Sequence, residues 1–484
     1  MNRLRRQWPL LLGLLVSLVV LWSEPTIVDL FCKGHVNWVS LHSLAIARHS
    51  TAELGGVGYS CRLMPEPGRL TFEYFNRYPI PFAVLSHWVL RPWQQDPASW
   101  LLAARQWMNL IFLATLASLF ALLRVVGASR VLAVAAVLGT AVMPVVLQYK
   151  TMFHFDQPVL LAYGLVAAVA VRCFSDRSVP GWAYLISLSL GVLAGRSAIL
   201  LCFAAALVVL YPRRSLAWIG MALSFGLVAV TTAYNIAWEA WLRSVPLPQT
   251  SVVESALRRL SLSEEGFDPE LLERTRLTWR AFHELLDNLM AYISPVLVLT
   301  LIALVLLVLF RRRPPWDPVQ DPTLKARRRL AWQSTGIASL LWLPLMKNLL
   351  VFHVYAAMVL LPLLTLVLLF SLERFCAVVP RWQKTLPPAL AATLVSVFLF
   401  QVGQSDPGRL RPSFEREQLL AAFLKDVGQF TASTPLDQPV DRSKKWIPGS
   451  PFAQCALLDQ PLWSGDDAVA PSLATPPPFP DRPR

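Results

Sequence analysis

Long apolar runs, each close to the length of a membrane-spanning helix, constrain this chain more than any other feature. A bilayer core accepts a helix of about 20 apolar residues. On that rule the sequence predicts an all-α polytopic membrane protein with roughly eleven transmembrane helices. The predicted spans are residues 8–24, 100–123, 131–149, 157–173, 182–196, 197–211, 215–234, 291–310, 332–346, 349–371 and 386–403. The two spans that meet at Gly195-Arg196 are short, which is typical of a broken or re-entrant pair.

Basic residues give the expected orientation of these helices. The net charge is +14, but the Lys and Arg residues form short clusters beside apolar runs, which disfavours nucleic acid as a partner. If the helices alternate, these clusters fall on one side, which the positive-inside rule makes cytoplasmic. The basic N-terminus and its apolar run then form a retained first span. Residues 25–99, 150–156, 235–290 and the tail from 404 lie on the external side.

The expected organisation is a transmembrane domain over residues 1–403 and an external tail over 404–484. The first external loop, 25–99, is expected to carry juxtamembrane helices, and 235–290 has the Leu and Phe spacing of amphipathic surface helices. The tail should hold one amphipathic helix near 413–430 and then an extended or disordered Pro-rich end. Cys32 and Cys61 share the first loop and could form a disulfide bridge in an oxidising compartment.

Histidines recur every seven residues in the segment Gly34 to His49. In a helix His35, His42 and His49 would share one face, with neighbours about 10.5 Å apart, which is too far for joint ligation of one metal. One interpretation is a solvated or interfacial helix face. The other is that the helix lines a cavity and offers imidazoles to a phosphate or a sugar hydroxyl.

The stretch TFEYFNRYPIP, residues 71–81, concentrates aromatic and charged residues between apolar segments. Tyr74 and Tyr78 could belong to an interfacial aromatic belt, and Glu73 and Arg77 could be an ordinary helical pair. Alternatively, Arg77 binds a phosphate while the aromatic faces hold a sugar ring. The apolar residues that follow are expected to return to the membrane surface as a short helix.

A very short external loop, YKTMFHFDQP, ends in Asp156 just before a predicted helix. Asp156 could simply be the N-cap of that helix, because it stands two residues before Pro158. A carboxylate at a membrane mouth is costly, however, and His154 lies two residues earlier. Asp156 is therefore also a candidate general base or metal ligand.

Two cations, Arg196 and Lys347, stand near the expected outer ends of spans, and Arg105 is a similar case. Each could extend its charge to the interface, or it could bind an anionic lipid-phosphate group. No His, Asp and Glu spacing in the chain is diagnostic of a metal site. No metal site is therefore assigned, and a divalent cation stays open as a cofactor.

Taken in order, these motifs resemble the GT-C superfamily of integral membrane glycosyltransferases, the group that contains protein O-mannosyltransferases and bacterial aminoarabinose transferases. The resemblance rests on the large first loop, on LAIAR at 44–48, on YFNRYP at 74–79 and on MFHFDQP at 152–158. One departure stands out. Aligning on LAIAR puts Val39 and Ser40 where the family usually has an acidic residue, and His35, Asn37 and His42 lie nearby.

The resemblance implies which residues form the site. The catalytic candidates are Asp156, which matches the family's acidic position in the second external loop, and the first-loop histidines His35 and His42. Asp29 and Glu53 are less favoured carboxylates. The resemblance also places His353 and Tyr355 among side chains that point into the cavity. The expected donor and phosphate contacts are Arg77, Arg196, Lys347, Tyr74, Tyr78, His353 and Tyr355.

The activity implied by the resemblance is inverting transfer of a sugar from a polyprenyl-phosphate carrier to an acceptor hydroxyl on the external leaflet. The expected partners are this lipid-linked donor, the bilayer, and a lipid, polysaccharide or protein acceptor. The expected location is a bacterial plasma membrane, with the active site and tail outside. The alternatives are a surface-polysaccharide ligase or polymerase, and a lipid or sugar flippase, which would favour mid-span charges and an inverted repeat.

Overall fold

The computed structural model of the 484-residue chain describes Leu15 and residues 34–52, 55–66, 69–74, 79–141, 143–195, 197–242, 321–346, 354–378, 440–441 and 462–463. The predicted spans at 291–310 and 386–403, and nearly all of 8–24, lie outside these ranges. So do the surface helices expected beyond residue 242 and the tail helix near 413–430.

The described part is mainly helical, which confirms the expected fold class of a polytopic membrane protein. Four described helical segments are long and apolar enough to cross a bilayer: Ser99–Val125, Gln157–Ser175, Ser215–Trp238 and Tyr355–Arg374. Arg130–Ala141, Gly181–Ala194 and Ala198–Leu210 are shorter apolar helices. The bundle helices are α5 Pro97–Val125, α6 Arg130–Ala141, α7 Pro144–Tyr149, α8 Gln157–Ser175, α9 Gly181–Ala194, α10 Ala198–Leu210, α11 Ser215–Leu242, α16 Pro322–Leu345 and α18 Leu361–Val378.

Two predicted spans differ from the observed helices, and proline accounts for both differences. The span predicted at 131–149 is divided, because α6 ends at Ala141 and α7 begins at Pro144. The span predicted at 349–371 begins in its described part as a 3-10 helix, η3 (Val354–Leu360), and turns α-helical only at Leu361, one residue before Pro362. Proline lacks the N–H for the preceding turn and clashes with it, so it favours the first turn of a new helix.

Other helix starts follow side-chain capping. The carboxylate of Asp96 accepts a hydrogen bond from the backbone N–H of Ser99 at 3.0 Å, and α5 begins between them. Asp321 does the same for α16 through the backbone N–H of Thr323 at 2.8 Å. This capping satisfies amide groups that the first helical turn leaves without partners. It explains why α16 begins ten residues before the apolar run predicted at 332–346.

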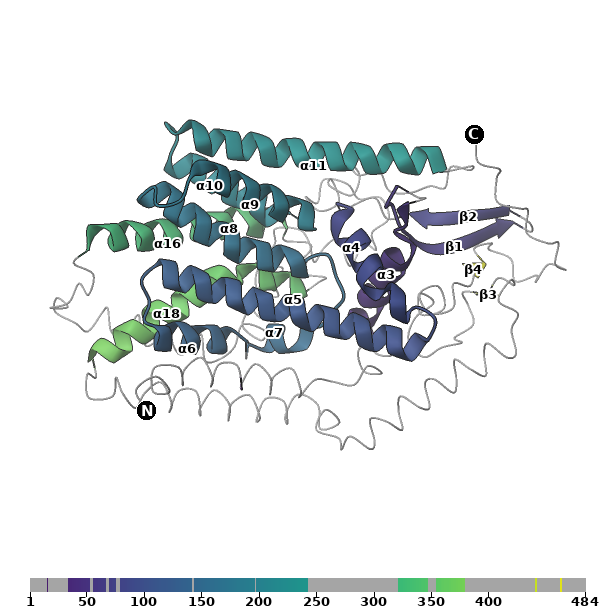
Figure 1. The fold of residues 1–484 in the computed structure, drawn as a ribbon, viewed down its shortest axis with the longest axis horizontal. Helices are drawn as coiled ribbons and strands as arrows, with labels where there is room; N and C mark the ends of the chain where they lie inside the picture. Colours follow the sequence, from purple (N-terminus) through teal and green to yellow (C-terminus); the bar gives the residue numbers. More distant parts are fainter. Residues whose placement is uncertain are drawn as a thin grey trace, which may run out of the picture.

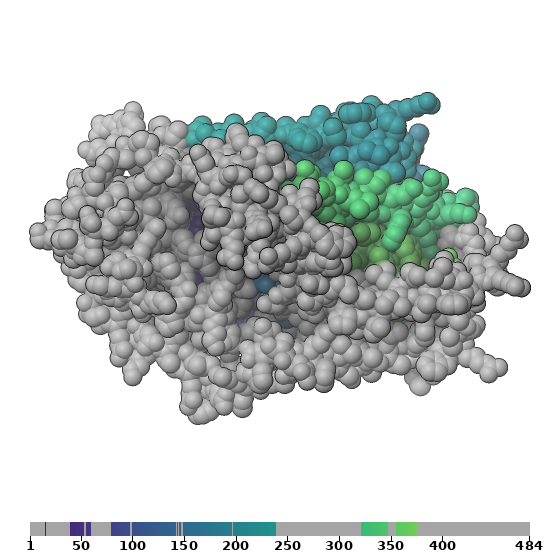
Figure 2. All heavy atoms as spheres, turned by 180° about the vertical axis from the view of Figure 1, so that it is seen from behind, coloured from purple at the N-terminus to yellow at the C-terminus, as the bar shows by residue number. Residues whose placement is uncertain are grey.

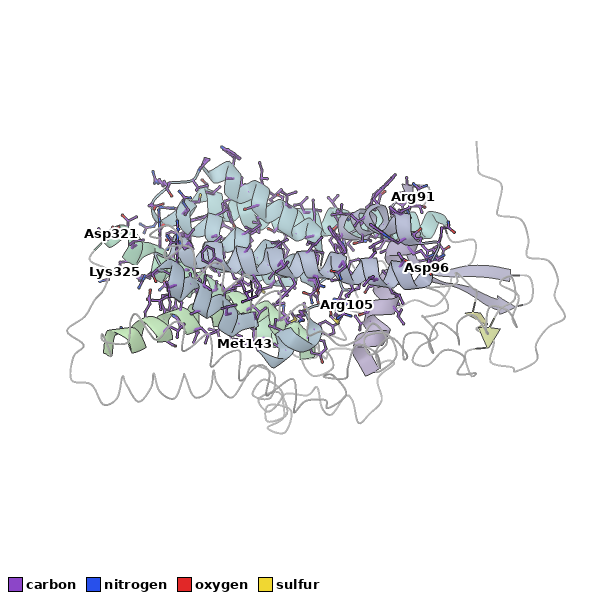
Figure 3. All side chains as sticks on the ribbon, turned by 60° about the horizontal axis from the view of Figure 1, so that its bottom comes forward. Arg91, Asp96, Arg105, Met143, Asp321 and Lys325 are labelled. Atoms are coloured by element: carbon purple, nitrogen blue, oxygen red, sulfur yellow. The ribbon has the colours of Figure 1, made fainter. Side chains whose placement is uncertain are left out.

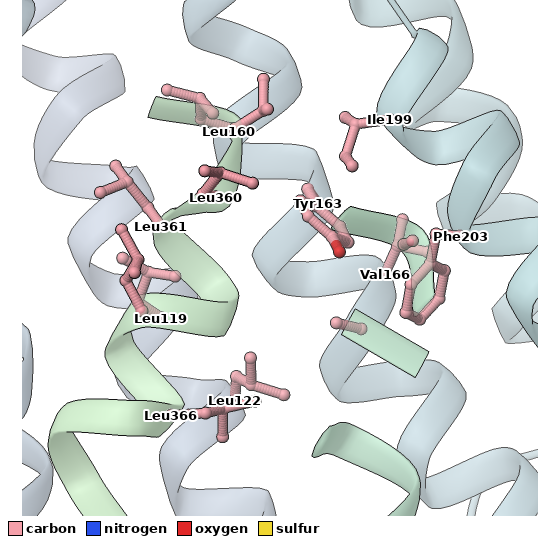
Figure 4. Close-up of a cluster of buried hydrophobic side chains, with 14 of the residues drawn as sticks. Leu119, Leu122, Leu160, Tyr163, Val166, Ile199, Phe203, Leu360, Leu361 and Leu366 are labelled. Carbon is pink, nitrogen blue, oxygen red and sulfur yellow. The ribbon is translucent and has the colours of Figure 1, made fainter. Parts of the chain in front are cut away.

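The bundle encloses one large apolar core. Figure 1 shows α5, α8, α9, α10 and α11 running alongside one another, and α5 packs on α8 while α10 packs on α11 and α16. In the close-up of Figure 4, Leu361 and Leu366 of α18 face α5, and Tyr163 of α8 lies near Phe203 of α10. The Tyr163 and Phe203 rings meet edge to face, with centroids 5.5 Å apart.

A small sheet stands at one end of this bundle and was not expected from the sequence. Strand β1 (Tyr59–Glu66) pairs antiparallel with β2 (Arg69–Tyr74), with Arg62 opposite Phe72. The short strands β3 (Val440–Asp441) and β4 (Leu462–Trp463) extend it in the order β2-β1-β4-β3 (Figure 1). We call this end of the bundle the sheet end. Part of the tail therefore pairs with part of the first loop in this sheet.

The strand β2 also changes the interpretation of residues 71–81. Glu73 lies opposite Cys61 in a strand, so the helical pairing of Glu73 with Arg77 is wrong for the described part of this stretch. Successive side chains of a strand point to opposite faces. Extended backbone therefore replaces the expected helical turn.

Apolar side chains also cover much of the outer surface. Trp182, Ile186 and Leu190 of α9 are exposed at intervals of four residues, so they form one helical face. Seen from behind in Figure 2, α11 in teal and α16 and α18 in green reach the surface. An exposed apolar face on a helix of spanning length is the surface that hydrocarbon chains cover in a bilayer.

Ion pairs fasten the opposite end of the bundle. Arg327 of α16 donates from Nε to Oδ2 of Asp176 at 2.6 Å, and the backbone N–H of Ser178 donates to Oδ1 of Asp176 at 3.1 Å. Burial raises the pKa of Asp176, but the hydrogen bonds from Ser178 and Arg327 and the charge of Arg327 outweigh it. The net effect is a pKa below the ordinary aspartate value.

A second pair lies at the same end. Arg328 binds both carboxylate oxygens of Glu373, at 2.9 and 2.8 Å, and also donates to the Val126 carbonyl oxygen at 2.9 Å. It thereby joins α16, α18 and the end of α5. Asp321 and Lys325 mark this end in Figure 3, where Arg91 and Asp96 mark the sheet end.

Candidate functional site

The loop between α7 and α8 is fully enclosed at the sheet end of the bundle. Every residue from Tyr149 to Leu160 is buried, including Lys150, Thr151, His154 and Asp156. A buried loop is unusual, because its polar groups lose their water and need partners inside the protein. The loop therefore forms part of the protein interior at the sheet end.

Asp156 occupies the N-cap position of α8, but its carboxylate does not cap the helix. Its backbone is αR, and α8 has no side-chain cap hydrogen bond at its start. Instead Oδ2 lies 3.3 Å from Nδ1 of His154, and Asp156 is only 7% exposed. The structural interpretation of Asp156 as an ordinary N-cap is therefore wrong.

His154 brings two groups of Asp156 to one ring nitrogen. Its Nδ1 faces the backbone N–H of Asp156 at 3.2 Å as well as the carboxylate. When Nδ1 carries no proton, it accepts the amide N–H. When Nδ1 carries a proton, it donates to the carboxylate instead.

Tyr355 packs against the His154 ring, and Tyr149 packs against Tyr355 in turn. Tyr355, on η3, meets the ring at 61° with centroids 5.2 Å apart, and Tyr149 lies 5.8 Å from Tyr355. Tyr355 is buried. The structure therefore joins a late-span aromatic residue to the loop that carries Asp156.

Gln157 closes this loop. Its side-chain Nε2 donates to the Tyr149 carbonyl oxygen at 2.8 Å and touches the sulfur of Met358 at 4.0 Å. Its backbone N–H donates to the His154 carbonyl oxygen at 3.2 Å. One side chain thus ties the end of α7, the start of α8 and η3 together around the His154–Asp156 pair.

The break between α9 and α10 contacts the same loop. A Cβ added to Gly195 would lie 1.9 Å from the Phe155 carbonyl oxygen, so only glycine allows the backbones to approach this closely. The predicted short pair is therefore two separate helices with a tight connection. Irregular backbone within a membrane protein is tolerated where protein or water encloses it. Here the backbone at Gly195 packs against the loop between α7 and α8, which we call the site loop.

The first-loop helix, α3 (Gly34–His49), packs against β1 and a short helix, α4 (Pro81–Leu90). His42 and His49 are both buried, so the interpretation of this face as solvated is wrong for these two residues. Nδ1 of His49 lies 3.0 Å from the Tyr59 carbonyl oxygen, and the two rings stack with centroids 3.9 Å apart. His49 therefore holds α3 to β1.

The predicted site residues divide into three groups. Asp156 and Tyr355 are brought together through His154, and His42 is placed on the buried part of α3. His35 and Tyr74 are placed only as backbone, in α3 and β2. The remaining candidates lie outside the described residues: Arg77, Tyr78, Arg196, Lys347 and His353.

Sequence reasoning missed the roles of His154, Gln157 and Gly195. A His two residues before an Asp in a very short loop is a weak signal for a pair. The contacts of Gln157 and Gly195 need the three-dimensional fold. Among the described residues, no group of three or more His, Cys, Asp or Glu side chains could hold a metal ion.

Comparisons with known proteins include a likeness to a solved membrane-protein structure. No family model matches the sequence, and no curated protein matches it. The chain resembles the crystal structure of ArnT from Cupriavidus metallidurans bound to undecaprenyl phosphate, with 14% sequence identity and a TM-score of 0.44. That likeness covers 95% of this chain and 86% of the ArnT chain.

Proposed function

We propose that this protein is a membrane glycosyltransferase that moves a sugar from a polyprenyl-phosphate carrier to an acceptor hydroxyl at the external leaflet. The observation that carries the proposal is the Asp156 carboxylate. It is buried, it does not cap its helix, and it lies 3.3 Å from His154 Nδ1.

Burying a carboxylate in a membrane protein costs free energy, so a buried carboxylate usually has a function there. Asp156 stands at the end of a short loop, at the level where α9 breaks and η3 begins. We propose that a lipid-bound donor and an acceptor from outside the membrane meet at this carboxylate. A purely structural aspartate at the start of α8 would instead accept from the free helical N–H groups.

The reaction is a single displacement at the anomeric carbon. The acceptor oxygen forms the new bond to this carbon as its proton passes to the Asp156 carboxylate, which the neighbouring His154 imidazole holds in position. The bond from the anomeric carbon to the phosphate oxygen breaks, and the phosphate leaves with the electron pair. Cations at the phosphate would stabilise the negative charge that develops there.

The cations proposed for the phosphate are Arg77, Arg196 and Lys347. Arg196 directly follows Gly195 in the sequence, and the Gly195 backbone lies against Phe155 in the site loop. The aromatic residues proposed for the donor are Tyr74, Tyr78 and Tyr355, together with His353. Tyr355 already lies against His154.

His35 and His42 remain proposed as alternative proton acceptors from the first loop. Asp156 is preferred because its carboxylate has a defined imidazole neighbour. A divalent cation, if one is used, would need ligands beyond His154 and Asp156, since zinc takes three or four protein ligands and calcium more.

The proposal is tested by incubating the purified full-length protein in liposomes with radiolabelled hexoses and pentoses on undecaprenyl phosphate, together with a bacterial envelope fraction that supplies lipid, polysaccharide and protein acceptors. Release of undecaprenyl phosphate together with labelled acceptor is the expected result. Movement of intact donor across the bilayer without bond cleavage would instead identify a flippase. Growth of a multi-sugar product would identify a polymerase.

A further inference from the structure

Helix α4 and the short 3-10 helix η2 (Arg91–Trp93) present large apolar side chains to the outside. Leu85 is 51% exposed, Trp88 59% and Trp93 44%. Leu85 and Trp88 are three residues apart and therefore share one helical face. The guanidinium of Arg91 lies 5.7 Å from the centre of the Trp88 ring, so a cation accompanies this apolar surface.

The opposite face of α4 is fixed to the body of the protein. Phe82 is buried, with its ring 5.7 Å from those of Phe153 and Phe155 in the site loop. His87 donates through Nδ1 to the carbonyl oxygen of Arg48, the last but one residue of α3, at 2.8 Å. The exposed residues are thus held on a rigid element.

The length of α5 places α4 relative to the bilayer. At 1.5 Å per residue, its 29 residues extend about 43 Å, which exceeds the ~30 Å hydrocarbon core. Arg124 lies at the end of α5 that is opposite the sheet end. About 20 residues before it, α5 reaches Arg105. Trp107, one half-turn later, donates from its indole Nε1 to Ser86 of α4 at 3.1 Å. The boundary of the hydrocarbon core therefore passes at the level of α4.

We propose that α4 and η2 form a membrane-interface anchor that binds anionic phospholipid. Leu85, Trp88 and Trp93 lie in the zone between headgroups and acyl chains, where indole rings are favoured. Arg91 binds the phosphate of an anionic headgroup while its planar group rests near the Trp88 ring. This inference is independent of the proposed glycosyl transfer.

The bilayer is favoured over a protein partner because of the neighbouring surface. Leu102 and Leu110 of α5 are also exposed, and α5 packs directly against α4. Apolar surface therefore continues from α4 onto a helix of spanning length. In Figure 3, Arg91 lies at the end of the bundle opposite Asp321 and Lys325. The basic residue on this surface complements the negative charge of the headgroups.

The experiment measures lipid contact directly in liposomes of phosphatidylcholine and phosphatidylglycerol. A Leu85→Cys variant, made in a cysteine-free background, carries an environment-sensitive fluorophore, and doxyl-labelled lipids of each class quench it. The expected results are strong quenching by shallow doxyl labels and weaker quenching by deep ones. Ala52→Cys, an exposed position after α3, provides a control that should show little quenching.

Arg91 gives the test of lipid class. Doxyl phosphatidylglycerol should quench the label at position 85 more strongly than doxyl phosphatidylcholine at equal mole fraction. Arg91→Gln should lower this preference about fivefold, since one basic residue near an anionic surface contributes on the order of 1 kcal/mol. Arg130→Gln, at the opposite end of the bundle, should leave the preference unchanged.

Three results would overturn the proposal. One is quenching at position 85 no stronger than at position 52. Another is a phosphatidylglycerol preference that survives Arg91→Gln or falls equally in Arg130→Gln. The third is protection of position 85 that rises with protein density, which would make a second copy of the chain its partner.

Discussion

Replacing Gly195 with alanine tests whether the α9–α10 break is built around the site loop. The new Cβ would lie 1.9 Å from the Phe155 carbonyl oxygen and 2.9 Å from its carbon, whereas real Cβ contacts essentially never fall below 3.0 Å. The two backbones must therefore separate by about 1.1 Å. The obstacle is main chain, which cannot rotate away as a flexible side chain would.

The φ angle of Gly195 is 169°, an extended value open to alanine, so the effect comes from the contact alone. Overpacking of this kind costs about 1–3 kcal/mol. A shift of about 1 Å beside the reacting groups can also lower the rate about 100-fold. The measurements are thermal unfolding of the purified protein in detergent and the transfer rate in liposomes.

Gly226→Ala is the matched control. Gly226 lies within α11, and a Cβ added there meets nothing within 4 Å. Alanine in place of glycine within a helix stabilises by up to about 1 kcal/mol, so this variant should keep or raise the melting temperature. If Gly195→Ala melts and reacts like Gly226→Ala, the inferred contact with the site loop is wrong.

Three further changes probe other contacts. Because Asp176 has a lowered pKa when folded, its pair with Arg327 should stabilise the protein above about pH 4, and this stability should be lost as pH falls through the folded pKa. Urea titrations across that range should show a smaller loss of stability at acid pH in Arg327→Gln than in the unmodified protein. An equal loss in both would refute the role of the pair. Glu373→Gln leaves the half-buried Arg328 without its charge partner, so it should destabilise by about 1–3 kcal/mol. A double-mutant cycle with Arg328→Gln should show coupling rather than additive losses. Gln157→Met keeps the side-chain length but loses the donor, so it should lower the transfer rate with little change in donor affinity; an unchanged rate would remove its positioning role.

Much of the helical fold could be predicted because the length and spacing of apolar residues favour a helix within a single local stretch of sequence. The helices α5, α8 and α11 begin within three residues of their predicted starts, since apolar runs and N-terminal proline or aspartate mark them. The clusters of basic residues were also expected to gather at one end. In the structure Arg327 and Arg328 indeed fasten that end through Asp176 and Glu373.

The sheet and the contacts of the site were harder to predict because they depend on distant parts of the chain. The strand pairing of Leu63 with Leu462 joins segments about 400 residues apart, and no local pattern in β4 announces it. The sequence could nominate Asp156, but its N-cap position suggested a structural role. Only the measured position of His154 and the missing cap bond separate the two interpretations.

The most direct test of the central claim is the single-turnover transfer rate of Asp156→Asn compared with its donor affinity. Asparagine keeps the shape of the side chain but cannot take a proton. We expect a rate about 10²–10⁴-fold lower with a donor Kd close to that of the unmodified protein. Asp96→Asn, an exposed cap at the same end that asparagine can replace, should keep the full rate. A normal transfer rate in Asp156→Asn would contradict the account.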